Sequence, residues 1–493
     1  MKKLSKVLSA TLATSFVFAG VACGIDTNNS RTTLTLIETG GEPILFEYLD
    51  AGFGSDPYIA VANAFMEEHP EYQIVTIPNR QISGTTSTNL SANTDVSDIY
   101  SYPYGGPIRT WISKGWVEDL TDLCTTQKTL DNRTILESMT GNSAKSISRV
   151  DKATNERHIY AIPEYTSVTG FVYNIDLFEE NGWKVPNTTK ELEDLCKQIL
   201  NEKGGKVAPI VWCDSADGYL YFATENWISQ YEGIDNMNKF HEYASADVYA
   251  LEDNEAGSIY SAKKASLEAV AKFFTSIKDG GYAHNDSEDL DNVNAQYAVI
   301  EGSAAMMLNG SWFENEMVQY LSDERIGMFP LPELSDSYGM PLRADGYTTE
   351  DNKRVLTADY GAYYFIPTMA PNKQGAKDFL LYLSSEKACS IYTQYSNAVR
   401  PFQYDMSKTS TLYSKVGVFG QSILDIGDQY YLYSVASDSD LAFKGLGGLW
   451  ARGVRIEREV LGAGVGANVT LYLDKDYGHA TKNWQDWLAS TGK

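Results

Sequence analysis

The sequence predicts an α/β protein, because patterns typical of strands and of helices alternate along most of the chain. The clearest case is a strand, helix, strand unit over residues 44–77, in which ILFEYLD and YQIVTI are the strands. The composition agrees with a folded protein of this class, since 43% of the residues are hydrophobic and 21% are charged. The 493 residues are enough for several domains and a large buried core.

The helix of this first unit carries its own start and stop signals. Asp56 is predicted to be the N-cap, Pro57 occupies the first helical position, and Pro70 ends the helix. Apolar residues recur at helical spacing at Ile59, Ala62, Phe65 and Met66. A third strand is predicted in VSDIYSY, residues 96–102, followed by one short helix and a turn in WISKGWVEDLTDL.

The N-terminus is typical of an export signal, with an apolar stretch from Val7 to Ala22 after a basic start. That stretch is shorter than the about 20 residues that a membrane-spanning helix needs. The small residues before Cys23 resemble a bacterial lipobox, in which this cysteine is lipidated, although Gly20 stands where leucine is usual. We expect residues 1–22 to be a signal peptide and residues 23–43 to be a lipidated cysteine and tether. An ordinary secretory signal with Cys23 as a bystander is the alternative.

The formal net charge of −25 at pH 7 restricts the partners of the protein. So acidic a surface repels nucleic acid and anionic lipid, which argues against DNA, RNA and peripheral membrane binding. Any membrane attachment is therefore expected to depend on the lipid, without help from a basic patch.

Neither the cysteines nor the acidic runs predict a metal site. Beyond Cys23 the chain has four cysteines, Cys124, Cys196, Cys213 and Cys389. They form no C-x-x-C pair and have no histidine at ligand spacing, and their three disulfide pairings stay open. We favour four buried free thiols, because a chain this long does not need cross-links. The acidic run DSEDLDN, residues 286–292, lacks the glycine and terminal glutamate of an EF-hand, so a solvated loop is predicted.

Further motifs follow one another over most of residues 44–460. Residues 160–199 join a strand ending in Tyr-Asn, an Asp-Leu-Phe turn, a bend with glycine and a Pro-x-Thr helix cap. The stretch YAVIEGSAAMMLNGSWF, residues 297–313, joins a helix, a glycine, a buried strand and an Asn-Gly-x-Trp ending. IGMFPLPE and residues 359–392 complete the set. In this order the motifs resemble the extracellular solute-binding proteins of ABC importers, in particular the branch that binds sugars.

This resemblance implies a periplasmic-binding-protein-like fold, with two α/β lobes, a hinge and a ligand cleft between the lobes. The implied first lobe takes residues 44–163 and 331–383, and the second takes residues 164–330 and 384–493. It also implies a monomeric receptor that is not an enzyme and needs no cofactor. Such a receptor captures a carbohydrate and delivers it to the membrane subunits of an ABC permease. The expected location is the outer face of the cell membrane, through the lipid anchor, or the periplasm.

The resemblance also implies which residues bind ligand. Aromatic rings stack on sugar faces, while amides, carboxylates and cations hydrogen-bond to sugar hydroxyls, so these side-chain types suit a neutral oligosaccharide. In the second lobe the implied residues are Trp212, Tyr219, Trp312, Trp450 and Arg452. In the first lobe and beside the hinge they are Asp50, Phe53, Tyr102, Tyr104, Glu164 and Tyr165, with a further polar corner at Asn397 and Arg400. Each has an ordinary packing or surface role as its alternative, and for Trp312 the two are evenly balanced.

The ligand and the function class are left open in three respects. Maltodextrin receptors carry an Asp-Arg pair soon after the third strand, where this chain reads YPYGGP, so the sugar is not identified. Related receptors take up polyamines, ferric iron, phosphonates or peptides on the same fold. A secreted glycoside hydrolase would need two carboxylates around a scissile bond, and a chain with 65 acidic residues can supply such a pair. Against it stands the absence of G-x-S-x-G, H-E-x-x-H and phosphate-loop signatures.

Overall fold

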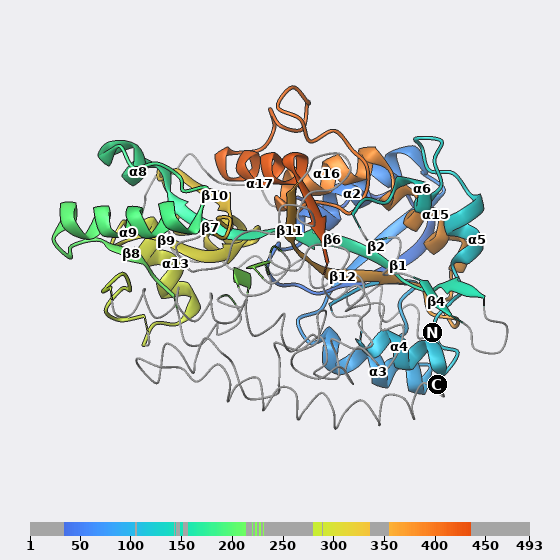
Figure 1. The fold of residues 1–493 in the computed structure, drawn as a ribbon. Coiled ribbons are helices and arrows are strands. Elements are labelled where there is room, and N and C mark those ends of the chain that lie inside the picture. The colour runs from blue at the N-terminus through green and yellow to red at the C-terminus, as the bar shows by residue number, and fades with distance from the viewer. Residues whose placement is uncertain are drawn as a thin grey trace, which may run out of the picture. The chain divides into compact units, whose positions relative to one another are not determined.

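The described residues of the protein form two compact units, which we call unit 1 and unit 2 (Figure 1). Unit 1 combines the described residues of 1–140, 147–165 and 361–405, and unit 2 combines those of 141–146, 166–360 and 406–493. The computed structural model describes residues 34–103, 106–141, 143, 148–150, 156–212, 219, 222–223, 226–227, 230, 280–287, 289–335 and 354–434.

Unit 1 is built on a sheet of five strands. Their order across the sheet is β2 (Tyr72–Pro78), β1 (Glu42–Tyr48), β3 (Ile99–Pro103), β12 (Asp359–Phe365) and β6 (Ile162–Ser167). β1 pairs in parallel with both β2 and β3, whereas β12 runs antiparallel to β3. Parallel neighbours need crossover connections, and two helices supply them: α2 (Asp56–Glu68) leads from β1 to β2, and α3 (Ile82–Ala92) leads from β2 to β3.

The first strand, helix, strand unit is confirmed, with one correction at the start of its helix. Asp56 was predicted to be the N-cap, but α2 begins at Asp56 itself and Ser55 is the N-cap. The Asp56 carboxylate instead accepts a hydrogen bond from the backbone N–H of Leu34 at 3.3 Å, so it is engaged outside the helix. The helix ends at Glu68, two residues before Pro70, as the sequence predicts.

The remaining elements of unit 1 surround this sheet (Figure 1). They are α4 (Gly106–Ser113), α5 (Thr121–Thr126), α6 (Ile135–Ser138), α15 (Lys373–Leu383), α16 (Glu386–Ser396) and a hairpin of β4 (Ser148–Val150) and β5 (Arg157–Ile159). Two helices, α4 and α5, thus stand where one short helix and a turn were predicted. α16 packs against α2, which anchors the C-terminal part of the unit.

Unit 2 is built on a sheet of four strands. Their order is β10 (Ile326–Pro330), β7 (Thr169–Asn174), β9 (Ala304–Gly310) and β8 (Ala208–Ile210). β7 runs antiparallel to β10 and β9, while β8 and β9 are parallel, and all seven residues of β9 are buried. The other elements are α8 (Ile175–Asn181), α9 (Thr189–Lys203), α13 (Asn292–Ile300), α14 (Phe313–Met317), α17 (Val418–Gln429) and a parallel pair of β11 (Arg354–Thr357) with β13 (Tyr430–Tyr433).

The glycine bend and the Pro-x-Thr helix cap predicted within residues 160–199 are confirmed in unit 2, whereas the helix α8 stands where an Asp-Leu-Phe turn was predicted. The Asn174 side chain caps α8 by accepting from the backbone N–H of Leu177 at 2.9 Å. Gly182 ends α8 with a φ of 66°, a left-handed conformation that favours glycine. Thr188 caps α9 by accepting from the N–H of Glu191 at 3.2 Å, and Glu191 lies in the first turn, near the positive end of the helix dipole.

The division into units differs from the predicted lobe boundaries in two segments. The described residues 331–335 and 354–360 belong to unit 2, although they were expected in the first lobe, because β11 pairs with β13. Residues 384–405 belong to unit 1, although they were expected in the second lobe, because α16 packs on α2. Two changes of unit fall inside strands, at residues 165/166 in β6 and 360/361 in β12.

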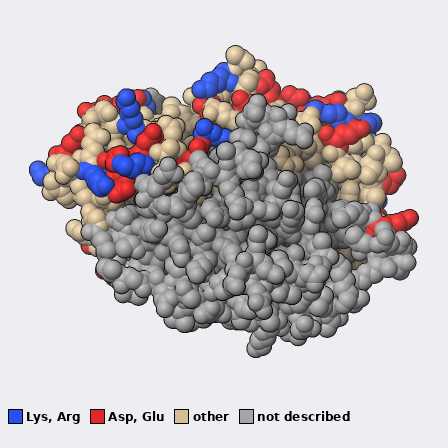
Figure 2. All heavy atoms as spheres, viewed as in Figure 1, with Lys and Arg blue, Asp and Glu red and all other residues tan. Residues whose placement is uncertain are grey.

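On the described part of the chain, acidic and basic side chains are mixed on the surface and the cysteines are buried. Acidic and basic side chains are interspersed on the face drawn in Figure 2, as in α9, where Lys197 pairs with Glu193 at 2.6 Å. Cys124, Cys196 and Cys389 are buried free thiols as predicted, and Cys213 lies outside the described residues. Within the described ranges, no helix combines the length and apolarity that a membrane crossing requires.

Candidate functional site

Three aromatic side chains gather in unit 2. The Trp312 ring lies 5.7 Å from that of Tyr219 and 6.0 Å from that of Phe222, centroid to centroid. Tyr219 and Phe222 stack on each other at 5.8 Å with an angle of 19° between the rings. The indole N–H of Trp312 donates to the Tyr219 hydroxyl at 3.1 Å, which fixes the two rings relative to each other. We call these three residues the aromatic cluster.

The end of β9 positions Trp312. The strand finishes at Gly310, and a Cβ atom on that glycine would lie 2.2 Å from the Cζ3 atom of Trp312. The indole ring therefore lies directly over the Gly310 backbone, and only glycine leaves room for it. The Ser311 N–H donates to the carbonyl of Val168 at 2.9 Å, which holds the turn between β9 and α14. Trp312 remains partly exposed in this arrangement.

Trp212 belongs to the same edge of the unit 2 sheet. β8 and β9 are parallel, and Trp212 follows β8 as Trp312 follows β9. Carboxyl ends of parallel strands meet at one sheet edge, where open α/β sheets bind their ligands. Trp212 is partly exposed, and its backbone N–H donates to the Ser287 hydroxyl at 3.4 Å. Partly exposed rings at such an edge can stack on a flat apolar ligand face.

In unit 1, two predicted aromatic residues lie in contact. The rings of Phe53 and Tyr165 meet edge to face with their centroids 4.9 Å apart. A Cβ atom on Gly361 would lie 2.0 Å from Cε2 of Tyr165, so the tyrosine ring covers the backbone of β12 at this glycine. Phe53 is buried and Tyr165 is partly exposed. Tyr165 is the last residue of β6 that belongs to unit 1, and Gly361 is the first residue of β12 that belongs to unit 1.

Asp50, the predicted neighbour of this contact in sequence, has local partners. Its carboxylate accepts from Arg80 Nε at 3.1 Å and from the Ser55 hydroxyl at 3.4 Å. Arg80 is largely exposed, so this ion pair is solvated and contributes little to stability. Asp50 is partly exposed and keeps a carboxylate at the surface of unit 1.

Glu164 was predicted to bind ligand, but the structure places its side chain in the interior of unit 1. It is 0% exposed, and its Oε2 atom accepts a hydrogen bond from the Ser101 hydroxyl on β3. Burial raises the pKa of the Glu164 carboxyl, and the positive charge of Arg400 and the Ser101 hydrogen bond only partly offset this effect. The geometry therefore favours a structural role, in which Glu164 joins β6 to β3 within the sheet.

Arg400 was also predicted to bind ligand, and it too is buried, with 1% of its surface exposed. Its Nη1 atom donates to the Tyr364 hydroxyl at 2.9 Å and its Nη2 atom to the carbonyl of Leu383 at 3.1 Å. The guanidinium carbon lies 4.7 Å from the ring centroid of Tyr392 and 5.6 Å from that of Phe402. Aromatic faces stabilise a cation in this position, and Glu164 supplies a nearby negative charge.

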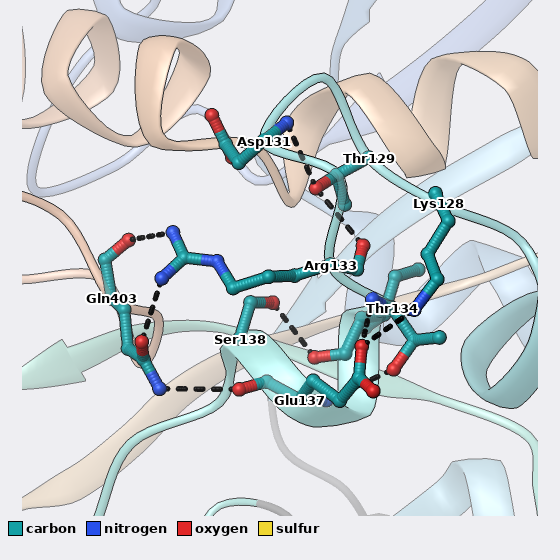
Figure 3. A network of polar contacts seen from close by, with 9 residues as sticks. Lys128, Thr129, Asp131, Arg133, Thr134, Glu137, Ser138 and Gln403 are labelled. Atoms are coloured by element: carbon teal, nitrogen blue, oxygen red, sulfur yellow. Dashed lines mark hydrogen bonds and ion pairs between the residues drawn. The ribbon is translucent and has the colours of Figure 1, made fainter.

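A polar network holds the segment that carries Arg400 (Figure 3). Arg133 Nη1 donates to the side-chain oxygen of Gln403 at 2.7 Å, and Gln403 Nε2 donates to the Glu137 carbonyl at 3.1 Å. Glu137 in turn accepts from the Thr134 N–H at 2.7 Å in a capping box and pairs with Lys128 at 2.8 Å. These contacts fix residues 397–403 against α6, which agrees with a packing role for this corner.

Two further predicted residues are buried in unit 1. Tyr102, on β3, meets Trp111 edge to face with ring centroids 4.9 Å apart. Asn397 ends α16 with a φ of 59°, a left-handed conformation that asparagine adopts more readily than most residues. The left-handed backbone conformation at the end of α16 thus explains why an asparagine stands at position 397. Tyr104, Trp450, Arg452 and Cys23 lie outside the described residues.

The described residues were also searched for a metal centre. Among them, no group of three or more His, Cys, Asp and Glu side chains is placed to hold a metal ion. In the acidic run 286–292, Asp291 is the N-cap of α13 and accepts from the Asn294 N–H at 2.8 Å. This carboxylate is therefore used by the helix.

Sequence reasoning missed three residues of the site. Phe222 completes the aromatic cluster, because its ring stacks on that of Tyr219. Gly310 and Gly361 lie beneath Trp312 and Tyr165, respectively. Gly310 is part of the Asn-Gly-x-Trp ending, whereas no signal in the sequence distinguishes Gly361 from other glycines, because its constraint comes from a ring that packs on it.

Comparisons of the sequence with known proteins agree on one family. Residues 60–418 match the family described as bacterial extracellular solute-binding protein. The chain is similar to the diacetylchitobiose binding protein NgcE of Streptomyces coelicolor, with 25% identity over 246 residues, 50% of this chain and 46% of that protein. It is also similar to the multiple sugar-binding protein of Streptococcus mutans, with 23% identity over 284 residues, 57% of this chain and 60% of that protein. The chain thus spans about half the length of these relatives.

Solved structures share the fold. The structure of RafE in complex with raffinose covers 89% of this chain and 99% of its own length, with a TM-score of 0.60 and 14% sequence identity. At this identity the likeness concerns the fold alone. It confirms the predicted periplasmic-binding-protein-like α/β fold.

Proposed function

Because the chain belongs to the bacterial extracellular solute-binding proteins, we propose that it binds a carbohydrate outside the cell and delivers it to the membrane subunits of an ABC transporter. The similar proteins support the choice of ligand class, since their names refer to diacetylchitobiose, multiple sugars and raffinose. A neutral oligosaccharide is the proposed ligand. The protein acts as a receptor in this proposal and catalyses no reaction.

The aromatic cluster is the observation that supports this proposal most directly. Trp312 lies partly exposed over Gly310 at the end of a buried strand, and Tyr219 holds its indole N–H. A ring held in this way loses little freedom when a sugar stacks on it, which favours affinity. We propose that Trp212 adds a second ring, and that Phe53, Tyr165 and Asp50 of unit 1 contribute the remaining contacts.

Isothermal titration calorimetry of the full chain against a panel of neutral oligosaccharides tests the proposal. We expect saturable one-to-one binding by the parent protein and an affinity at least about tenfold lower for Trp312→Ala, which is about 1.4 kcal/mol or more. Trp116→Ala is the matched control, because Trp116 is a partly exposed tryptophan of unit 1 that contacts Lys114 instead. Its affinity should equal that of the parent.

Two other outcomes of this experiment would reject the proposal. Release of reducing sugar in the same samples, at catalytic turnover, would favour the glycoside hydrolase. Absence of binding across the whole panel would favour a non-sugar solute on the same fold. A loss of affinity in Trp312→Ala counts only if the melting temperature of the variant matches that of the parent.

We further propose that Cys23 carries a lipid that anchors the receptor at the outer face of the membrane. The supporting observation is the sequence before it, an apolar stretch that ends in small residues. With a net charge of −25, the protein gains no electrostatic attraction to anionic lipid, so the anchor has to supply all of the attachment.

A further inference from the structure

Unit 2 exposes four large apolar side chains in two neighbouring segments. Val293 and Tyr297 on α13 are 44% and 41% exposed, and Val318 and Tyr320 at the end of α14 and beyond it are 42% and 41% exposed. Val293 and Tyr297 are four residues apart and share one helix face. The rings of Tyr297 and Tyr320 meet edge to face with centroids 5.8 Å apart, which joins the two segments. We call these four residues the apolar patch.

The rest of α13 shows that the apolar patch is additional to the core of unit 2. Ala295, Ala298 and Val299 lie on the other side of the helix and are buried. Gln296 is buried and donates to a Glu316 carboxylate oxygen at 3.1 Å, which fastens α14 to α13. The helix is therefore already packed on its core side. Scattered single apolar residues are normal on a surface, whereas Tyr297 and Tyr320 are in ring contact, so we treat the four residues together as a candidate interaction surface.

The stretch of sequence that carries the apolar patch is acidic. From Gly280 to Glu324 the sequence contains nine Asp and Glu residues and no Lys or Arg. Glu301 stands one helical turn beyond Tyr297, and Asp323 and Glu324 follow Tyr320. The next base along the chain, Arg325, donates from Nε to Asp176 at 2.7 Å and is thus already paired. On α9, by contrast, acids and bases alternate as ion pairs.

We infer that the apolar patch is a docking surface for a protein segment that carries Lys or Arg beside apolar side chains. The apolar residues would be covered by the apolar side chains of the segment, and the surrounding carboxylates would attract its positive charges. An anionic lipid surface does not fit, because the same carboxylates repel it. The inference rests on the proposed function in placing this segment on the membrane subunits of the transporter.

Binding to membrane vesicles tests the inference without knowledge of the sugar. The full chain with Cys23→Ser, which removes the proposed lipid, is sedimented with right-side-out vesicles of the producing cells and with protein-free liposomes of their lipids. The oligosaccharide panel is present throughout. We expect binding to the vesicles, and at least tenfold weaker binding for Tyr297→Ser/Tyr320→Ser and for the charge reversal Glu301→Lys/Asp323→Lys. Leu130→Ser, at an exposed leucine of unit 1, is the matched control and should bind like the parent.

Each contrary result either assigns the apolar patch to another binding partner or rejects the inference. Equal binding to the protein-free liposomes would assign the surface to lipid, and a patch-dependent dimer in sedimentation velocity would assign it to a second copy of the chain. Parent protein that does not bind the vesicles, or patch variants that bind as well as the parent with unchanged melting temperature, would overturn the inference. Failure of the proposed function is seen separately, as a lack of sugar binding in the calorimeter.

Discussion

At Gly361, the ring of Tyr165 leaves no room for a side chain. A Cβ atom there would lie 2.0 Å from Tyr165 Cε2, far inside ordinary contact distance, so Gly361→Ala forces the tyrosine ring to move. We expect a loss of about 1–3 kcal/mol in the free energy of unfolding, measured by urea denaturation. Because Tyr165 is also a proposed ligand contact, the sugar affinity measured by calorimetry should fall as well.

A double-mutant cycle distinguishes this cause from a general glycine effect. Tyr165→Ala removes the ring that blocks the new methyl group, so adding Gly361→Ala to it should cost much less than in the parent. Gly84→Ala is the control, since a Cβ on this glycine of α3 meets nothing within 4 Å. It should stabilise the helix slightly. Equal costs of Gly361→Ala with and without Tyr165 would contradict the steric explanation.

Single residues also show what a sequence can and cannot reveal about a site. Trp312 was named as a ligand contact because of the family resemblance, and the structure gives it two aromatic neighbours. Glu164 and Arg400 were predicted from the same kind of reasoning, yet both are buried in unit 1. Charge and aromaticity are visible in the sequence, whereas burial depends on which distant elements pack around the residue. A carboxylate and a guanidinium that stabilise each other in a core look the same in sequence as two ligand contacts.

At the scale of elements, Asn174 joins two helices of unit 2. Its oxygen caps α8, and its Nδ2 atom donates to the carbonyls of Val299 and Ile300 at the end of α13, both at 3.1 Å. Asn174→Ala removes the cap and leaves two buried carbonyls without this donor, so we expect a loss of about 2–3 kcal/mol in the free energy of unfolding. Urea denaturation measures it.

Two comparisons divide this loss into its parts. Asn174→Ser keeps a capping oxygen but removes the Nδ2 donor, and should fall between the parent and the alanine variant. Thr188→Ala removes the cap of α9 alone and should cost about 1 kcal/mol. If Asn174→Ala costs no more than Thr188→Ala, the contact with α13 contributes nothing and this interpretation is wrong.

The elements that the sequence predicts well are those that depend on near neighbours. The cap at Thr188 and the left-handed Gly182 lie within a few residues of the groups that they serve. The predicted start of α2 differs from the observed one by a single residue, and there the Asp56 carboxylate accepts from Leu34, more than twenty residues away. The strand order of unit 1 cannot be predicted from local patterns, since β12 pairs with β3 across more than 250 residues of chain.

At the scale of the whole molecule, the predicted lobes and the observed units differ for the same reason. The sequence order of motifs placed residues 331–383 together, but β11 pairs with β13 in unit 2 while α15 lies in unit 1. Each unit is assembled from three separate stretches of chain. Packing between distant elements decides where the chain changes from one unit to the other, and no local sequence pattern predicts that packing.

Anchoring also concerns the whole molecule, and Cys23→Ser tests it. We expect the parent protein to enter the detergent phase in a Triton X-114 partition and the variant to stay in the aqueous phase. Cys124→Ser is the control, because this thiol is buried and free in unit 1 and has no role in attachment. A Cys23→Ser protein that still enters the detergent phase would show that the membrane attachment has another origin.

The position of β12 in the unit 1 sheet sets the order in which the protein can fold. This strand stands between β3 and β6, so the sheet is incomplete until residue 365 has been synthesised. Until then β3 and β6 each lack the neighbour that covers one strand edge, and such edges invite pairing with other chains. The sheet of unit 1 can therefore close only once the chain through residue 365 is available, and a chain that is not yet closed exposes strand edges that can pair with other chains.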